Sequence, residues 1–265
     1  MKDDLVTVIA VGVLAFIAVD IAHEVVGHGI GLLLSGGRAG ILTTTRLISD
    51  VPRPGQSWRI FDLGGPAGNL SWAALCLVLQ RFQRGAAPRW RLFLWASAMF
   101  SLFWEFGYLM KCGLTGSGDY MALILGLKPA AVWRALLFLA GLMLYRAAIR
   151  LLTSDLHFVV RSADSGCRTR VTRLLWALYL AGGLAACAGA ILDPRGPGEI
   201  FNSGALSSFV ACLGLAFVPG LFGSYPDKSL AVGESVSRSA PITALAVLAL
   251  LLFVLVLGRG IPVSV

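Results

Sequence analysis

Charged residues are scarce in this sequence. Asp, Glu, Lys and Arg make up only 14% of its 265 residues, while hydrophobic residues make up 57% and the mean hydropathy is +0.80. Because a soluble globular domain carries about 25% charged residues, this composition excludes an ordinary soluble domain. It indicates an integral membrane protein whose surroundings are the lipid bilayer.

The charge that is present lies between the apolar stretches. The formal net charge is +8, and arginines gather in short clusters within residues 81–91 and 161–173. In a membrane protein these are positions at which basic side chains meet anionic lipid headgroups. We therefore expect no nucleic-acid partner.

Paired cysteines are absent and histidines are few. None of the five cysteines belongs to a C-x-x-C pair, which argues against a cysteine-based metal or redox motif and favours small buried hydrophobic side chains. The chain has only three histidines. Three are too few for the histidine-rich di-iron sites of membrane oxidases.

Charge-free apolar stretches mark the expected membrane spans. They cover residues 5–19, 63–80, 92–104, 135–145, 174–192, 200–226 and 239–258. Because a spanning helix needs about 20 apolar residues, and terminal arginines extend the shorter stretches, we expect an all-α polytopic fold with about six to seven transmembrane helices. The polar segments 153–172 and 223–239 are predicted to be loops. We expect a multi-pass protein of a bacterial plasma membrane.

Two of the three histidines lie close together at the end of the first predicted span, in "IAHEVVGHGIG" (residues 21–31). Asp20, His23, Glu24 and His28 are neighbours there. Ionisable groups at this depth are costly, face the interior of a helix bundle and mark function. The alternative interpretation is a polar cluster that holds helices together by hydrogen bonds.

The spacing of the two histidines is unusual. The common zinc-protease motif is H-E-x-x-H, with both imidazoles on one helix face and the glutamate as general base. Here the string is H-E-V-V-G-H, and residues five apart on a regular helix point about 140° apart. A π-bulge absorbs one extra residue, and Gly27, which has no Cβ atom, offers the least steric resistance to this distortion. The sequence therefore predicts a bulged turn around residues 25–27.

A catalytic zinc takes three protein ligands and leaves a fourth position for water, so two histidines need a third ligand. Asp119, in the glycine-rich segment "CGLTGSGDY", is the favoured candidate, although an aspartate there also suits a helix N-cap. Glu105, in "LFWEFGY", is the alternative third ligand or the partner of an arginine. Asp62 is expected to cap or orient, and His157 to be an ordinary surface histidine.

The segment "GGPAGN" (residues 64–69) follows in the next predicted span. Its glycines permit a close backbone approach, and Pro66 suits the first turn of a helix from which Asn69 projects. If spans alternate in direction, this segment shares one membrane face with residues 23–28 and 113–119. Residues 39–49 are rich in β-branched side chains, which predicts a short hairpin near that face, or else an amphipathic loop.

These residues resemble the site-2 protease family of intramembrane zinc metalloproteases. The resemblance rests on the His23, Glu24 and His28 motif, on "GGPAGN", which is similar to the family's G-P-x-x-N element, and on Asp119. It implies that His23, His28 and Asp119 bind Zn2+, that Glu24 is the catalytic general base and that Asn69 positions a membrane-anchored protein substrate. The histidine spacing is one residue longer than is usual in that family, a spacing found in the dipeptidyl peptidase III zinc peptidases.

The resemblance covers residues 1–128, a membrane core with the zinc motif. Residues 129–265 carry no motif and are expected to add C-terminal transmembrane helices. Hydrolysis of membrane-embedded peptide bonds is the favoured function. Two alternatives stay open: a catalytically silent metal-binding scaffold, and an ion transporter that uses the intramembrane His, Glu and Asp cluster. The distribution of basic residues and the family resemblance favour opposite orientations in the membrane.

Overall fold

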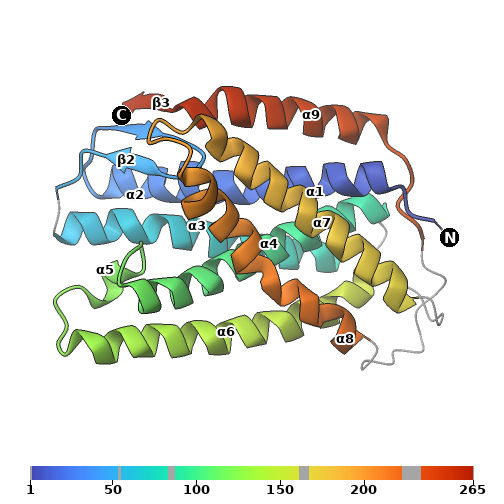
Figure 1. Cartoon of the computed structure of the whole chain (residues 1–265), viewed down its shortest axis with the longest axis horizontal. Coiled ribbons are helices and arrows are strands. Elements are labelled where there is room, and N and C mark those ends of the chain that lie inside the picture. The colour runs from blue at the N-terminus through green and yellow to red at the C-terminus, as the bar shows by residue number, and fades with distance from the viewer. Residues whose placement is uncertain (1, 53–54, 83–86, 161–166, 223–233, 265) are drawn as a thin grey trace.

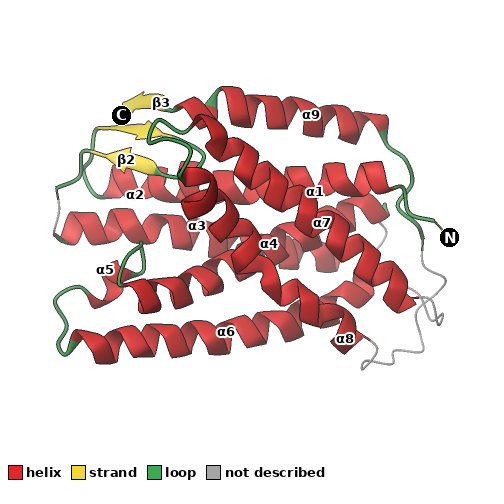
Figure 2. Ribbon diagram, viewed as in Figure 1, coloured by secondary structure: helices red, strands yellow, loops and turns green. Residues whose placement is uncertain are grey.

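The computed structural model describes residues 2–52, 55–82, 87–160, 167–222 and 234–264, and most of them are helical (Figures 1 and 2). The α-helices are α1 (Leu5–Asp20), α2 (His28–Leu34), α3 (Gln56–Phe82), α4 (Pro88–Thr115), α5 (Met121–Ile124), α6 (Ala130–Val159), α7 (Cys167–Gly189), α8 (Val218–Phe222) and α9 (Ala240–Leu255). The π-helices are η1 (Ile21–Gly27) and η3 (Ile200–Val210), and the 3-10 helices are η2 (Ala190–Leu192), η4 (Ala211–Phe217) and η5 (Leu257–Arg259).

Within the described residues, six helical stretches are long and apolar enough to cross a membrane. They are Leu5–Leu34, Pro88–Thr115, Ala130–His157, Arg168–Leu192, Ile200–Phe222 and Ala240–Arg259. This confirms the expected all-α polytopic fold and identifies a multi-pass membrane protein. Consecutive elements share some of these stretches, because α1, η1 and α2 form one continuous helical rod.

The second predicted span, residues 63–80, is helical but is not among the stretches that are long and apolar enough to cross a membrane. It lies within α3, which is 27 residues long but is interrupted by polar side chains and is not one of the six stretches. The helix begins at Gln56, so Pro66 lies in its interior, and the prediction that Pro66 occupies the first turn is wrong. The helix extends further because Phe61 is buried and Trp58 packs beside it in the small core next to the sheet.

The predicted loop 153–172 is also wrong over most of its length. Helix α6 continues to Val159 and α7 begins at Cys167, while residues 161–166 lie outside the described part of the chain. The helix persists because Leu152, Leu156 and Val159 belong to the main apolar core. For the predicted loop 223–239, residues 223–233 are outside the described residues, as is the end of the predicted span 200–226.

Helix α4 lies at the centre of the bundle and packs against α1, α3 and α6, whereas α1 also packs against α7 and α9. Large aromatic side chains fill the interface between α1 and α4. Phe16 stacks on Trp104 with ring centroids 5.8 Å apart and meets Phe100 edge to face at 5.7 Å. Close packing of this kind fixes the rotation of α1 against α4, and with it the direction of the polar groups at the end of α1.

A small antiparallel sheet lies at the end of the molecule where α2 and α5 are found (Figure 1). Strands β1 (Ala39–Leu42) and β2 (Leu47–Ser49) form the expected hairpin, with Ile41 opposite Ile48. The third strand, β3 (Ile261–Ser264), pairs with the other edge of β1 and was not expected. The strand order is therefore β2-β1-β3, which holds residues 261–264 against residues 39–42 beside the site described next.

Candidate metal centre

The helix changes its winding at the histidine motif. Residues Ile21–Gly27 form the π-helix η1, and the chain returns to an α-helix at His28. The bulged turn predicted from the H-E-x-x-G-H spacing is thereby confirmed. It brings the two imidazole rings together, with centroids 5.0 Å apart and an interplanar angle of 76°. Both side chains are buried.

Asp119 completes a group of three possible metal ligands. Its Oδ2 atom lies 3.4 Å from His23 Nε2 and 3.4 Å from His28 Nε2, and the three ligand atoms all lie within 4.8 Å of one another. Two ligands held at about 2.0 to 2.1 Å from a tetrahedral ion are about 3.3 to 3.4 Å apart. The two distances from Asp119 to the histidines therefore fit ligands of a single tetrahedral ion.

The segment after α4 places Asp119. Helix α4 ends at Gly116, whose φ of 70° is the left-handed conformation that glycine adopts at helix ends, and the backbone N–H of Asp119 donates to the Tyr108 hydroxyl at 3.2 Å. The Asp119 carboxylate makes no cap on the following helix α5. It points to the histidines, so the alternative role as an N-cap does not describe this side chain.

Both imidazoles are anchored through Nδ1, which leaves Nε2 free for a metal. His28 Nδ1 lies 3.0 Å from the Phe61 carbonyl oxygen, and His23 Nδ1 lies 2.9 Å from Glu105 Oε1. Carbonyl and carboxylate oxygens accept hydrogen bonds, so each Nδ1 is the donor, and the Nε2 atom that faces Asp119 is the one that would bind a metal. A hydrogen bond from the ring nitrogen that does not face the metal to a carbonyl or carboxylate is typical of metal-binding histidines. Trp104 stacks on the His23 ring at 5.1 Å and restricts its rotation.

Glu105 lies on the Nδ1 side of His23, away from Asp119. Its carboxylate is completely buried and accepts hydrogen bonds from Asn69 Nδ2 at 2.8 Å and from the Tyr120 hydroxyl at 2.9 Å. Burial and the nearby Glu105 carboxylate raise the pKa of Tyr120 above its usual value, so its hydroxyl keeps the proton that it donates. The structure thus places Glu105 where it orients His23, and its contacts are with these polar groups rather than with an arginine.

Asn69 belongs to the same buried network. Its Nδ2 atom lies 3.2 Å from His23 Nδ1, and the side chain is fully buried. It does not line the cavity described below, whereas the family resemblance implies that it touches substrate. Tyr120 and the orienting role of Glu105 were not identified from the sequence. Tyr120 directly follows the predicted ligand Asp119 in the sequence, and this position was the only local sign that it belongs to the site. Nothing in the sequence indicated that its hydroxyl points to Glu105.

The segment "GGPAGN" packs closely against η1. A Cβ atom on Gly65 would lie 2.5 Å from Nε2 of His23 and 2.5 Å from Nε2 of His28, and one on Gly27 would lie 2.5 Å from the Gly64 carbonyl oxygen. Only glycine permits these approaches. Pro66 has no N–H, so the carbonyl of Asp62, four residues earlier, receives no helical hydrogen bond from it. The Phe61 carbonyl, one residue before Asp62, accepts the hydrogen bond from His28.

A cavity of about 890 Å³ opens beside the three ligands. Its walls include Asp20, His23, Glu24, His28, Thr44, Thr45, Arg46, Asp62, Lys111, Asp119, Asn202, Ser203 and Ser207. Glu24 is 3% exposed, and its Oε2 atom makes no hydrogen bond within the described residues.

Asp62 lies on the cavity wall within α3, not at its N-cap. His157, on α6, stacks on Phe222 and is not on this wall.

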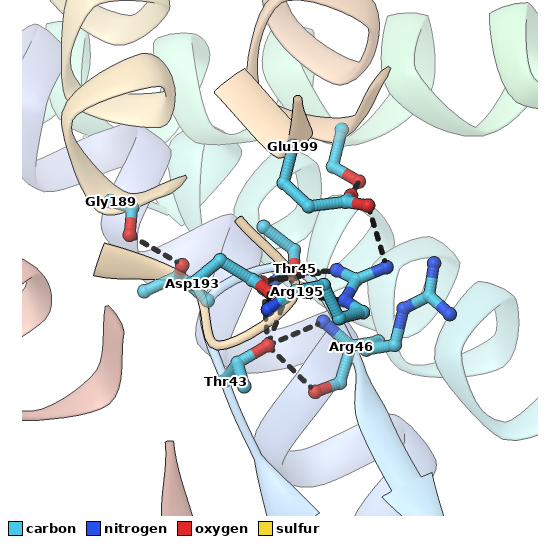
Figure 3. Close-up of polar contacts among 9 residues, drawn as sticks. Thr43, Thr45, Arg46, Gly189, Asp193, Arg195 and Glu199 are labelled. Carbon is cyan, nitrogen blue, oxygen red and sulfur yellow. Dashed lines mark hydrogen bonds and ion pairs between the residues drawn. The ribbon is translucent and has the colours of Figure 1, made fainter. Parts of the chain in front are cut away.

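A polar cluster ties the β1–β2 turn to the segment between α7 and η3 (Figure 3). The Thr45 hydroxyl donates to Asp193 at 2.5 Å and accepts from Arg195, while Arg195 also forms ion pairs with Asp193 and Glu199 at 3.0 Å. Burial alone would raise the pKa of Asp193, but hydrogen bonds from Arg195 and Thr45 hold it below its usual value. This cluster was not predicted from the sequence, in which the charged turn "DPRG" (residues 193–196) is its local signal.

Comparison of the chain with models of protein families, with curated proteins and with solved structures finds no match.

Proposed function

We propose that this protein is an intramembrane zinc-dependent endopeptidase that hydrolyses peptide bonds of membrane-anchored proteins. One observation carries the proposal: His23, His28 and Asp119 converge with metal-ligand spacing on the same cavity that Glu24 lines. Two imidazoles and one carboxylate form the ligand set of catalytic zinc, which keeps a further position for water. This arrangement supports the resemblance to the site-2 protease family. The six apolar helical stretches support a location in a membrane, which we propose to be a bacterial plasma membrane.

The residues of the chain divide the chemistry between them. Zinc held by His23, His28 and Asp119 would polarise the scissile carbonyl and acidify the attacking water. Glu24 takes the proton of that water and transfers it to the leaving amide nitrogen, as a general base and then a general acid. Its unpartnered Oε2 atom in the cavity is available for this proton. Glu105 and the Phe61 carbonyl keep both imidazoles in the orientation that exposes Nε2.

A substrate helix must become extended before its peptide bonds are accessible. Strand β2 is an outer strand of the sheet, and its first residue, Leu47, lies on the cavity wall beside Thr45 and Arg46. An extended segment that pairs with this edge gains main-chain hydrogen bonds and enters the cavity. We therefore include β2 in the proposed binding surface.

Metal content and cleavage of a membrane-anchored reporter test the proposal. Protein purified in detergent should contain about one zinc ion per chain, and this content should fall in His23→Ala, His28→Ala and Asp119→Ala. Glu24→Gln should keep its zinc and lose cleavage, because the amide cannot accept the proton.

The possible results separate the three functions. Unchanged metal content in the ligand variants would remove the site. Bound zinc without cleavage by the parent protein would favour a metal-binding scaffold, and ion flux across proteoliposomes by a parent protein that does not cleave would favour a transporter.

A further inference from the structure

A further acidic side chain on the cavity wall, that of Asp20, has no role in the proposed reaction. Asp20 is the last residue of α1, about one helical turn before Glu24, and it lines the same cavity. The residue is only 1% exposed. Its Oδ2 atom makes no hydrogen bond within the part of the chain that the structure describes.

The other acids of the site have partners or a function. Glu105 is held by His23, Asn69 and Tyr120, and Asp119 by the two histidines. Asp62, on the same wall, also has a partner within the chain. The free oxygen of Glu24 belongs to the proposed proton transfer. Burying an unpartnered carboxylate is costly, and within a membrane such a group marks a pathway or a ligand. The Oδ2 atom of Asp20 therefore lacks a partner among the described residues, and we expect that partner to come from outside the chain.

The two basic side chains on the cavity wall do not supply that partner. Lys111 contacts Ser117, near the end of α4, and Arg46 lies in the turn of the β hairpin. Neither forms a hydrogen bond or ion pair with Asp20 among the described residues. A carboxylate accepts hydrogen bonds and attracts positive charge, so its natural ligand is a primary amine or a guanidinium.

We infer that Asp20 is a specificity subsite that receives a lysine or arginine side chain of the substrate. The inference rests on the proposed protease function. Asp20 and Glu24 are four residues apart, about 6 Å along a helix axis, which an extended substrate covers in about two residues. The basic side chain then lies within about two residues of the scissile bond, and Asp20 selects membrane segments that carry a basic residue near the cleavage point.

A set of membrane-anchored reporters tests this subsite. Each reporter has lysine at one position near the cleavage point, and its partner has glutamine at the same position. For the parent protein, lysine within about two residues of the scissile bond should raise kcat/KM at least about tenfold over glutamine. The ratio should fall to about one in Asp20→Asn, and zinc content and melting temperature show whether that variant is folded.

A binding measurement keeps the test independent of the Asp20 variant. Lysine and glutamine forms of the same peptide are titrated in micelles against the Glu24→Gln protein, which retains Asp20. The lysine form should bind about tenfold more tightly. Equal binding, equal cleavage of both reporters by the parent, or a lysine preference that survives in Asp20→Asn would overturn the subsite. If the parent cleaves neither reporter, the proposed protease function fails instead.

Discussion

Gly65 lies at the point where the two imidazoles approach each other, and this makes it the most direct test of the metal site outside the ligands. We predict that Gly65→Ala weakens zinc binding about tenfold to a hundredfold, because its Cβ would lie 2.5 Å from both Nε2 atoms and overpacking costs about 1–3 kcal/mol. Zinc affinity, measured by competition with a chelator, checks this.

The chain provides a matched control for this substitution. Gly29 is also helical, and a Cβ atom there would meet nothing within 4 Å. Gly29→Ala should therefore leave zinc affinity unchanged and stabilise α2 slightly, since alanine favours a helix by up to about 1 kcal/mol over glycine. Equal zinc affinity in Gly65→Ala and Gly29→Ala would show that the metal does not sit between the two imidazoles.

Glu105 provides a second test, because it acts through His23 rather than on the metal. We predict that Glu105→Gln lowers zinc affinity about tenfold to a hundredfold, as loss of a partner of a metal-binding histidine does. A competition titration measures the affinity, and the melting temperature of the zinc-free protein is the reference. If the melting temperature falls while zinc affinity is unchanged, Glu105 is structural and does not orient His23.

The residues of the site were predictable to different degrees. Local sequence identified the H-E-x-x-G-H motif, the glycines of "GGPAGN" and Asp119, because each has a spacing or a backbone requirement. The contact of Glu105 with His23 joins residues 82 positions apart. It depends on how α1 and α4 are rotated against each other, which aromatic packing between Phe16, Phe100 and Trp104 decides. No local pattern in a single sequence predicts how two helices are rotated against each other.

At the scale of secondary-structure elements, the link between the β1–β2 turn and the segment before η3 depends on the charge of Asp193. The pKa of this carboxyl is lower in the folded protein, so its contribution to stability is present above the unfolded pKa of about 4 and is lost as the pH falls through the folded value. We predict that Asp193→Asn lowers the melting temperature in micelles at pH 6 and that the difference from the parent narrows below about pH 4.

The pH dependence of this difference is the informative measurement. Glu199 also pairs with Arg195, so Glu199→Gln serves as a comparison within the same cluster. A difference between the parent and Asp193→Asn that stays constant from pH 3 to pH 7 would mean that the charge of Asp193 does not hold the turn.

The elements themselves were predicted well where the signal is local. Long apolar stretches identified the spanning helices, and β-branched residues identified the β1–β2 hairpin. Strand β3 was missed because its four residues, Ile261–Ser264, have little strand signal alone and pair with β1 more than 200 positions away. The start of α3 was missed because proline and glycine favour a helix start, whereas packing of Phe61 extends the helix past them.

At the scale of the whole molecule, the motif-bearing residues 1–128 are in close contact with residues 129–265. Helix α1 packs against α7 and α9, α4 packs against α6, and β3 pairs with β1. A Cβ atom on Gly12 of α1 would lie 2.9 Å from the Cβ of Ala181 on α7. The expected division at residue 128 follows the motifs, but the packing indicates that the second part supports the geometry of the first.

This leads to a prediction about the divided chain. Residues 1–128 expressed alone should hold much less than about one zinc ion per chain, because α1 loses its packing against α7 and α9 and α4 loses its packing against α6. Co-expression with residues 129–265 should restore zinc binding, since membrane helices insert independently and then associate. A His28→Ala fragment co-expressed in the same way is the control for nonspecific metal. Full zinc binding by residues 1–128 alone would instead show that the site is an independent unit, and that α7 and α9 contribute to some other property of the protein.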